Sequence, residues 1–350
     1  MMLRAICAVL LSLQVGMLPP ARVVRLYPEG QAAGGGIVEN GLEISRGPGE
    51  ITRPDTTEFY WQRDGSLNAV SDSARVVLYL PQGCNGQLIL VCPGGGYNEL
   101  MFRSEGTYAA QCLTERGYAV GIVCYRMPVG HASAPLTDVQ NAFRYCRHHA
   151  GEWGITQIGV MGMSAGGHLA ACASTLYTDE VTRPDFTILF YPVVSCDTGL
   201  IHRGSFRKLT GLPADLITAA AALGGEVGSG FGAGPDADFA AAVPTGYTVE
   251  DVRAARMVLE HYSPVHNITA DTPPALLFHS ADDRGVPYAN SVSYFDRLRT
   301  AGVPAELHIF PSGGHGWGFN TLETAGRDKL EPYRATFFSA LDAFLSSLRP

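Results

Sequence analysis

The stretch from Gln157 to Ala170 constrains the fold of this chain more than any other. Ile158, Val160 and Met161 belong to a short apolar run that is long enough for one buried strand. The next five residues read Gly-Met-Ser-Ala-Gly (162–166), and small residues then continue in a pattern typical of a helix. A strand that passes into a helix through so short a turn predicts strained backbone at the middle residue of that turn.

Ser164 stands at the centre of this G-x-S-x-G pattern, in the context that defines a nucleophile elbow. A side chain at either flanking position would collide with the neighbouring strand or helix, which explains why both are glycine. The turn lifts the hydroxyl above the sheet, where the N–H of Ala165 and the start of the helix face a developing oxyanion. The alternative is a glycine-rich β–α turn with an incidental serine, so the choice depends on the serine's partners.

Continuous apolar runs alternate with helical patterns over most of the chain. Strands are expected at 75–80, 87–92, 119–125, 186–191, 274–279 and 305–310, and helices at 105–116, 137–151, 288–301 and near the C-terminus. This alternation predicts an α/β fold with a mostly parallel sheet covered by helices on both faces. The first two strands are joined by a short loop and are expected to lie antiparallel or adjacent. Residues 137–140 have the form of a capping box for their helix.

Two loops that follow strands carry candidate partners for the serine. A serine hydroxyl needs a base to take its proton, and the base needs a third group to hold its tautomer. His315 is the only one of ten histidines in a glycine-flanked loop after a strand. Asp282 and Asp283 follow the preceding strand, so the chain order is Ser, Asp, His. A surface-loop histidine and a solvated turn are the alternatives. A histidine base predicts activity that falls as the pH drops through about 6–7.

The loop Pro93–Tyr97 directly follows the strand at 87–92. Its glycines allow backbone N–H groups to point at a substrate oxygen, and Gly95 and Gly96 with Ala165 are the expected oxyanion hole. A bare glycine-rich turn is the alternative. Tyr97 and Trp317 are candidates for the wall of the substrate pocket, with simple packing as the other interpretation.

The composition excludes several classes of partner and site. The 350 residues carry a net charge of −8 without a basic run, which argues against nucleic acid. The chain has no C-x-x-C and no H-E-x-x-H pattern, so no metal site is expected. Five of the eight cysteines, at 92, 112, 124, 146 and 172, lie in apolar patterns and are expected to be buried thiols rather than disulfides.

The N-terminal segment resembles a secretory signal peptide. Arg4 precedes an apolar run that is too short to span a membrane, so residues 1–21 are expected to be removed and the protein to be periplasmic or secreted, without membrane insertion. The remaining 22–350 is expected to be one domain. It opens with an irregular lead-in at 22–74 and contains an insertion at about 197–262, whose Ala/Gly-rich part at 219–246 is of low complexity.

Taken together, these residues resemble the α/β-hydrolase superfamily, and more narrowly the bacterial acetyl xylan esterases and feruloyl-esterase-like carbohydrate esterases. The likeness covers roughly 75–350 and is carried by 92–97, 159–170, 273–290 and 303–319. The resemblance implies that Asp283 is the acid, because it opens the D-x-x-V-P run. It also implies no cofactor. Pro93 stands where many relatives have His, and the insertion is longer than expected and lies where such folds often place a lid.

Several functions are compatible with this sequence. The first is a carboxylic-ester hydrolase that deacetylates acylated polysaccharide or oligosaccharide through a Ser-His-Asp triad and an acyl-enzyme. A serine peptidase of the same fold is an alternative, although about 75 residues before the first clear strand cannot form the propeller that such peptidases usually carry. A lipase or small-molecule esterase and a non-catalytic binding protein are the others. All three expected triad residues are present, which disfavours the last.

Overall fold

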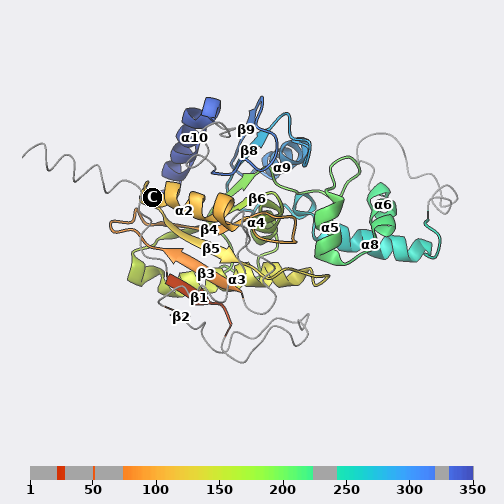
Figure 1. The fold of residues 1–350 in the computed structure, drawn as a ribbon, viewed down its shortest axis with the longest axis horizontal. Coiled ribbons are helices and arrows are strands. Elements are labelled where there is room, and N and C mark those ends of the chain that lie inside the picture. Colours follow the sequence, from red (N-terminus) through yellow and green to blue (C-terminus); the bar gives the residue numbers. More distant parts are fainter. Residues whose placement is uncertain (1–21, 28–49, 52–73, 224–242, 320–330, 350) are drawn as a thin grey trace, which may run out of the picture.

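The computed structural model describes residues 22–27, 50–51, 74–223, 243–319 and 331–349. The expected signal peptide at 1–21 lies outside these residues, as do most of the lead-in and part of the Ala/Gly-rich stretch. Two short strands of the lead-in are described, and they extend one edge of the sheet (Figure 1).

A nine-stranded sheet forms the centre of the described structure, in the order β2-β1-β3-β5-β4-β6-β7-β8-β9. From β5 to β9 all neighbours are parallel, whereas β2, β1 and β3 pair antiparallel. Every residue of β4 and β5 is buried, as expected for apolar runs covered on both faces. The strands are β1 Arg22–Arg25, β2 Glu50–Ile51, β3 Arg75–Tyr79, β4 Gln87–Cys92, β5 Ala119–Cys124, β6 Gln157–Met163, β7 Thr187–Phe190, β8 Ala275–Ser280 and β9 Ala305–Phe310.

The strands at 75–80 and 87–92, expected to lie antiparallel or adjacent, are antiparallel but not adjacent. These strands, β3 and β4, run in opposite directions, but β5 lies between them and pairs with both. The short loop between β3 and β4 therefore passes over the end of β5 instead of closing a hairpin. The cause is that β5, arriving after a helix, inserts its own buried residues at the centre of the sheet.

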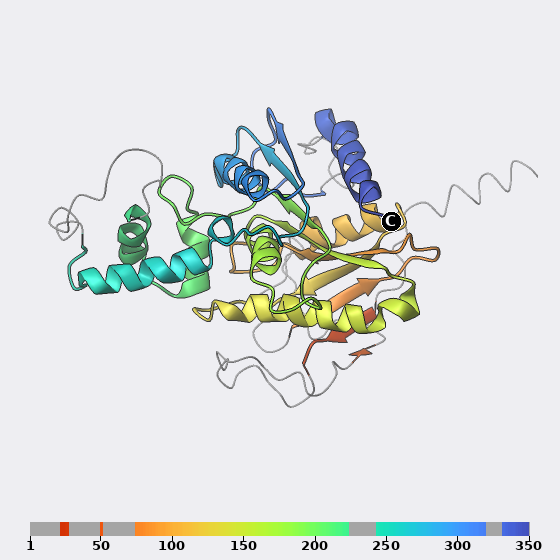
Figure 2. The same cartoon turned by 180° about the vertical axis from the view of Figure 1, so that it is seen from behind.

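Helices cover both faces of the sheet. In Figures 1 and 2, α2 (Tyr108–Thr114) and α10 (Arg334–Ser347) lie on one face, while α3 (Ser133–Trp153) and α4 (Ala165–Thr175) lie on the other. Arg116 links the first pair, since its guanidinium lies 3.8 Å from the ring centroid of Phe338. Helix α9 (Ala289–Thr300) packs against β8 and β9, and η4 (Glu331–Tyr333) precedes α10.

Two helix starts differ from the expectation. The helix expected at 105–116 begins earlier, with a π-helical turn η2 (Phe102–Thr107) that leads into α2. The expected capping box at 137–140 is wrong, because α3 already begins at Ser133 and the hydroxyl of Thr137 donates to the carbonyl of Ser133 inside the helix. The next residue, Asp138, is buried and pairs with Arg126.

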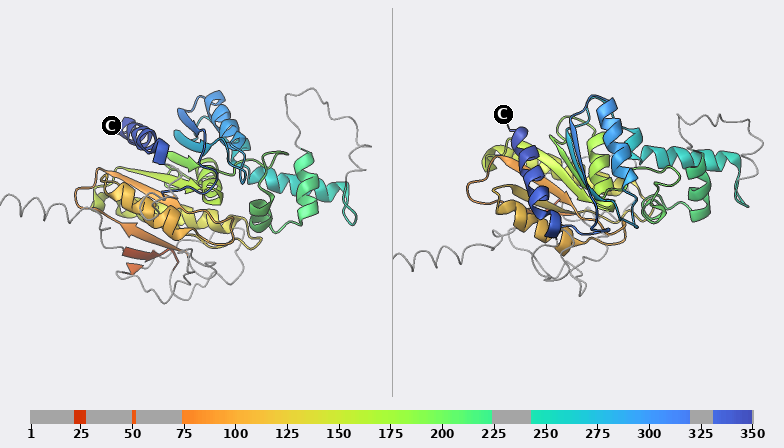
Figure 3. Two further views of the ribbon diagram at one scale, coloured as in Figure 1. Left: turned by 45° about the horizontal axis from the view of Figure 1, so that its top comes forward. Right: turned by 90° about the horizontal axis from the view of Figure 1, so that it is seen from above.

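Within its described residues, the segment expected as an insertion contains three helices, which stand beyond one end of the sheet in Figures 1 to 3. They are α5 (Arg203–Thr210), α6 (Ala214–Ala222) and α8 (Val249–His261), followed by the 3-10 turn η3 (Pro264–His266). Their buried residues, among them Phe206, Ile217 and Leu259, form a second apolar cluster together with Val193, Cys196 and Val286. Near the two ends of this segment, the N–H of Val265 donates to the carbonyl of Val194 at 3.2 Å.

The cysteines follow the sequence expectation. All seven in the described residues are free thiols, and Cys92, Cys112, Cys124, Cys146 and Cys172 are buried. None of the described helices has the length and apolarity needed to cross a lipid bilayer.

Candidate active site

Ser164 occupies the turn between β6 and α4 with φ 53° and ψ −119°. The expected steric role of the flanking glycines is confirmed. A Cβ on Gly162 would lie 2.1 Å from the carbonyl oxygen of Gly166, and a Cβ on Gly166 would lie 2.0 Å from the carbonyl oxygen of Cys92. The turn is held from the next strand, because the N–H of Ser164 donates to the carbonyl of Phe190 at 3.0 Å. The serine hydroxyl thus stands on a fixed backbone at the C-terminal end of β6.

His315 and Asp283 meet Ser164 from two loops that follow β9 and β8. Nε2 of His315 lies 2.9 Å from Oγ of Ser164, and Nδ1 of His315 lies 2.7 Å from Oδ2 of Asp283. Since a carboxylate only accepts, Nδ1 carries the proton and Nε2 of the neutral ring accepts from the hydroxyl. The imidazole is 29% exposed, whereas the carboxylate is completely buried. This arrangement can transfer a proton from Ser164 to His315.

The carboxylate of Asp283 is held by a set of donors. Its Oδ1 accepts from the N–H groups of Gly285 and Val286, at 2.8 and 2.9 Å. Nε2 of the buried His279 lies 3.2 Å from Oδ2. Burial alone would raise the pKa of Asp283, but the hydrogen bonds from His279, His315 and Val286 outweigh it and hold the pKa well below the usual range. The lowered pKa favours the ionised carboxylate, which accepts the hydrogen bond from Nδ1 of His315.

The neighbouring Asp282 makes a different contact. Its Oδ1 accepts from the N–H of Gly314 at 2.8 Å, so it fixes the loop that carries His315 and does not contact the imidazole. The two aspartates thus have distinct partners, although the sequence places both in the same turn.

The loop after β4 lies directly against the elbow. A Cβ on Gly94 would come within 3.1 Å of Cβ of Ser164. Gly95 and Gly96 both have positive φ, at 123° and 65°. Within the described part of the chain, no backbone hydrogen bond accounts for the N–H groups of Gly95, Gly96 or Ala165. These three donors are therefore available near the serine, as an oxyanion site requires.

Comparisons with known proteins agree with this geometry. Residues 77–188 match the family model BD-FAE, and residues 232–332 match the model of the prolyl oligopeptidase family. An acetylxylan esterase from Xylanibacter ruminicola is 35% identical over 261 residues, which cover 73% of this chain and 46% of that enzyme. The chain thus spans about half the length of this curated relative.

Two solved structures share the architecture at comparable identity. An acetyl ester-xyloside bifunctional hydrolase from Caldicellulosiruptor lactoaceticus is 29% identical with a TM-score of 0.55, over 76% of this chain and 88% of that one. A sugar hydrolase from Lactococcus lactis is 28% identical with a TM-score of 0.57, over 80% of this chain and 98% of that one. The chain has the α/β-hydrolase fold.

Two residues expected to line the substrate pocket are core residues instead. Tyr97 is 2% exposed, and its hydroxyl bonds Nδ1 of His168 at 2.7 Å. Trp317 is 3% exposed, and its ring packs edge-on against Tyr191 with 5.1 Å between centroids. Both therefore face inward, where aromatic bulk fills the space below the catalytic loops, and neither presents a surface to a sugar ring.

Sequence reasoning missed three buried polar residues beside the site: Glu105, Tyr191 and His279. Glu105 accepts from the N–H of Gly94 at 2.6 Å and from the hydroxyl of Tyr191 at 3.0 Å. Tyr191 directly follows β7, so the rule that functional side chains follow strands was a usable signal. His279 lies inside β8 and Glu105 lies inside a helical pattern. No sequence pattern marks either residue as functional. They stand out only because burying a polar group is costly.

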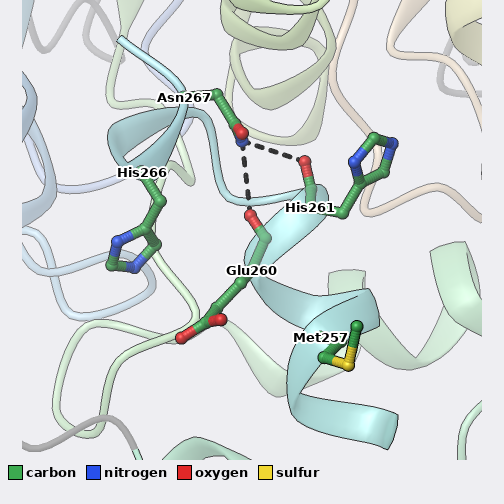
Figure 4. Close-up of a pocket in the computed structure, with 5 residues that line it drawn as sticks. All are labelled: Met257, Glu260, His261, His266 and Asn267. Atoms are coloured by element: carbon green, nitrogen blue, oxygen red, sulfur yellow. Dashed lines mark hydrogen bonds between the residues drawn. The ribbon is translucent and has the colours of Figure 1, made fainter.

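A pocket of about 520 Å³ lies where the end of α8 meets η3, away from the residues named above. Figure 4 shows its lining residues, which are Met257, Glu260 and His261 of α8, His266 of η3 and the following Asn267. Near it, Cys196, Asp197 and His266 are close enough to share a metal ion. The guanidinium of Arg256 lies 2.8 Å from Asp197, however, so a cation already neutralises the only carboxylate of this group.

Proposed function

We propose that this α/β-hydrolase is a serine carboxylic-ester hydrolase that removes short acyl groups, acetyl first, from acylated polysaccharide or oligosaccharide. The observation that carries the proposal is the unbroken hydrogen-bonded series from Ser164 through His315 to Asp283. A nucleophile, a base and an orienting carboxylate in contact are the parts that acyl transfer needs.

In the proposed reaction Oγ of Ser164 attacks the ester carbonyl carbon while Nε2 of His315 takes the hydroxyl proton. Asp283 holds the ring in its Nδ1–H tautomer and stabilises the imidazolium that forms. The N–H groups of Gly95, Gly96 and Ala165 receive the oxyanion, and each such donor contributes about 3–4 kcal/mol to the transition state. His315 then protonates the leaving sugar oxygen as the C–O bond breaks. Water next attacks the acyl-enzyme while His315 takes its proton. His315 returns a proton to Ser164 as the acyl group leaves as the acid.

The substrate class rests on the similar proteins and on charge. The Xylanibacter ruminicola relative is an acetylxylan esterase, and the Caldicellulosiruptor lactoaceticus structure is an acetyl ester-xyloside hydrolase. The net charge of −8 disfavours polyanionic substrates and agrees with a neutral acylated sugar.

A panel of p-nitrophenyl esters together with acetylated xylan tests this proposal. We expect acetyl turnover to exceed decanoyl turnover by more than ten-fold in kcat/KM, which corresponds to about 1.4 kcal/mol of transition-state binding. Acetate release from xylan should disappear in the Ser164→Ala variant. Equal or faster turnover of the long-chain esters would instead assign the protein to the lipases.

A serine peptidase is the second candidate, because residues 232–332 match the prolyl oligopeptidase family model. Peptide p-nitroanilides added to the same panel separate the two functions. We expect no turnover of these amides above that of the Ser164→Ala variant, and cleavage at rates comparable to the esters would favour the peptidase.

We also propose that the protein is exported by its N-terminal segment. The support is the single positive charge before a short apolar run within residues 1–21. Mass spectrometry of the native protein tests this, with an N-terminus near Ala21 in the extracytoplasmic fraction as the expected result. An intact N-terminus in the cytosolic fraction would contradict it.

A further inference from the structure

Glu105 is a buried carboxyl group that the proposed reaction does not use. Only 3% of the residue is exposed in η2, which leads directly into α2. Burying a carboxylate is costly unless its oxygens are paired, so its retention at this position needs a reason. Both of its oxygens are paired, and the two partners belong to different loops of the site.

The first oxygen holds the loop that precedes the oxyanion donors. Oε2 of Glu105 accepts from the N–H of Gly94 at 2.6 Å, a short charge-assisted bond. On its other side Gly94 abuts the elbow, because a Cβ there would lie 2.8 Å from the carbonyl oxygen of Met163. Glu105 therefore fixes Gly94 against the serine turn, and the next two residues supply the free N–H groups.

The second oxygen reaches the loop that carries His315. Oε1 of Glu105 accepts from the hydroxyl of Tyr191 at 3.0 Å, and that hydroxyl accepts in turn from the N–H of Gly318 at 2.8 Å. The ring of Tyr191 also packs edge-on against the imidazole of His315, with 4.8 Å between centroids. One hydroxyl thus joins the end of the histidine loop to Glu105.

The donors around Glu105 define its charge state. The N–H of Gly94 can only donate, and the hydroxyl of Tyr191 uses its proton toward Glu105 because it accepts from Gly318. Burial raises the pKa of Glu105 above its usual value, and the hydrogen bonds from Gly94 and Tyr191 together with the nearby His315 offset only part of this rise. Two donors and no acceptor match an ionised carboxylate.

We propose that Glu105 and Tyr191 form a buried link that positions the oxyanion loop and the His315 loop relative to each other. Glu105 is a positioning residue that acts through Gly94, and Tyr191 is a positioning residue that acts through Gly318 and the imidazole. The inference rests on the proposed ester hydrolysis, since it assigns the link to the site of that reaction. It predicts effects on kcat rather than on KM, because oxyanion contacts form fully only in the transition state.

Three variants of the link test the proposal: Glu105→Ala, Glu105→Gln and Tyr191→Phe. Rates are measured on p-nitrophenyl acetate and divided by the active sites titrated with a fluorophosphonate, which Ser164 attacks with loss of fluoride. We expect Glu105→Ala to lower kcat on the order of 10²-fold with KM changed less than three-fold. Glu105→Gln keeps an oxygen for the N–H of Gly94 and should recover most of this loss. Tyr191→Phe should lower kcat about ten-fold.

The double variant Glu105→Ala/Tyr191→Phe tests whether the two side chains act as one unit. We expect it to be no slower than Glu105→Ala alone, because the first substitution already breaks the link. Losses that multiply would show that the two residues act independently and would overturn the proposal.

A second buried pair provides the matched control. Asp138 is buried and accepts from the hydroxyl of Tyr27, but it belongs to α3 and pairs with Arg126 instead of a catalytic loop. Asp138→Asn and the milder Tyr27→Phe should lower Tm and leave kcat per titrated site within two-fold of wild type. If Glu105→Ala and Tyr191→Phe behave in the same way, the link is structural only and the proposal is wrong.

A failure of the proposed link can be distinguished from a failure of the proposed ester hydrolysis. Phosphonylation of Ser164 requires the nucleophile and the oxyanion donors but no particular ester. If the wild type reacts with the fluorophosphonate yet hydrolyses no acetyl ester, the proposed function fails. The phosphonylation rates of the same variants then still report on the link, with the same order of losses expected.

Discussion

Asp283 and His315 lie 32 positions apart in the chain, yet Oδ2 of the aspartate is 2.7 Å from Nδ1 of the histidine. The aspartate is completely buried, and two backbone N–H groups fix its other oxygen. An imidazole held in this way has its Nε2 lone pair directed at Ser164 and does not need to reorient before it accepts a proton.

The two adjacent aspartates should therefore respond very differently to the same substitution. Asp283→Asn should lower kcat about 10³- to 10⁴-fold, because an amide can donate to Nδ1 and so favours the wrong tautomer. Asp282→Asn should change kcat less than about ten-fold, since its amide oxygen can still accept from Gly314. Steady-state kinetics on p-nitrophenyl acetate measures both, and a larger loss for Asp282→Asn would reverse the assignment.

Removal of the Ser164 hydroxyl should abolish turnover without affecting the fold. We expect Ser164→Ala to lower kcat on the order of 10⁵-fold or more, because the triad acts as a unit. The free energy of unfolding should stay within about 0.5 kcal/mol, since the hydroxyl's partner, Nε2 of His315, is on a partly exposed ring that can bond water instead. Fluorophosphonate labelling followed by peptide mapping checks the assignment, and a label on any other residue would contradict it.

Tyr97 should contribute to stability and not to substrate binding. Nε2 of His168 donates to the carbonyl of Tyr262 at 2.6 Å, so Nδ1 must accept the hydroxyl proton of Tyr97. Tyr97→Phe leaves that buried lone pair without a donor and should lower the free energy of unfolding by about 1–3 kcal/mol. Urea denaturation measures the loss. If the KM for acetyl esters rises several-fold while stability is unchanged, Tyr97 lines the substrate pocket and this prediction is wrong.

The ion pair of His266 in η3 with Asp197 should make stability depend on alkaline pH. The hydrogen bond to Asp197 is the main reason that the pKa of His266 rises to about 9. Because the folded pKa exceeds the unfolded value of about 6.5, the stabilisation is fully present below pH 6.5 and is lost as the pH rises through about 9.

Urea denaturation between pH 6 and pH 10 measures this effect as the difference between wild type and His266→Gln. We expect the difference to shrink steadily across that range. The exposed His261→Gln serves as the control and should track the wild type. A difference that stays constant with pH would show that His266 carries no proton-linked stabilisation.

The sequence predicts much of the site because its candidate residues follow strands. Apolar runs define the strands, and parallel strands bring their C-terminal ends to one edge, so Ser164, Asp283 and His315 could be expected to meet. What the sequence does not contain is the order of strands in the sheet. The separation of β3 from β4 depends on where β5 inserts, which local pattern does not specify.

The errors in side-chain roles have one physical cause. Tyr97 and Trp317 combine a large apolar body with one polar atom, so the sequence permits either burial or a binding role. Glu105 was missed for a related reason. Its place in an expected helix does not show whether its carboxylate is buried or faces solvent. Only the partners of a polar group tell these cases apart, and the partners come from distant loops.

The single hydrogen bond between Val265 and Val194 has a consequence for how this protein can diversify. Because this bond joins the two ends of the segment beside β7, the length of chain between them can change without moving the pairing of β7 with β8. The segment is not isolated, however, since Val193, Cys196 and Val286 outside it share its apolar cluster. Replacing 197–262 with the corresponding segment of a relative should therefore leave the reaction chemistry in place only where the new segment keeps apolar side chains against Val193, Cys196 and Val286.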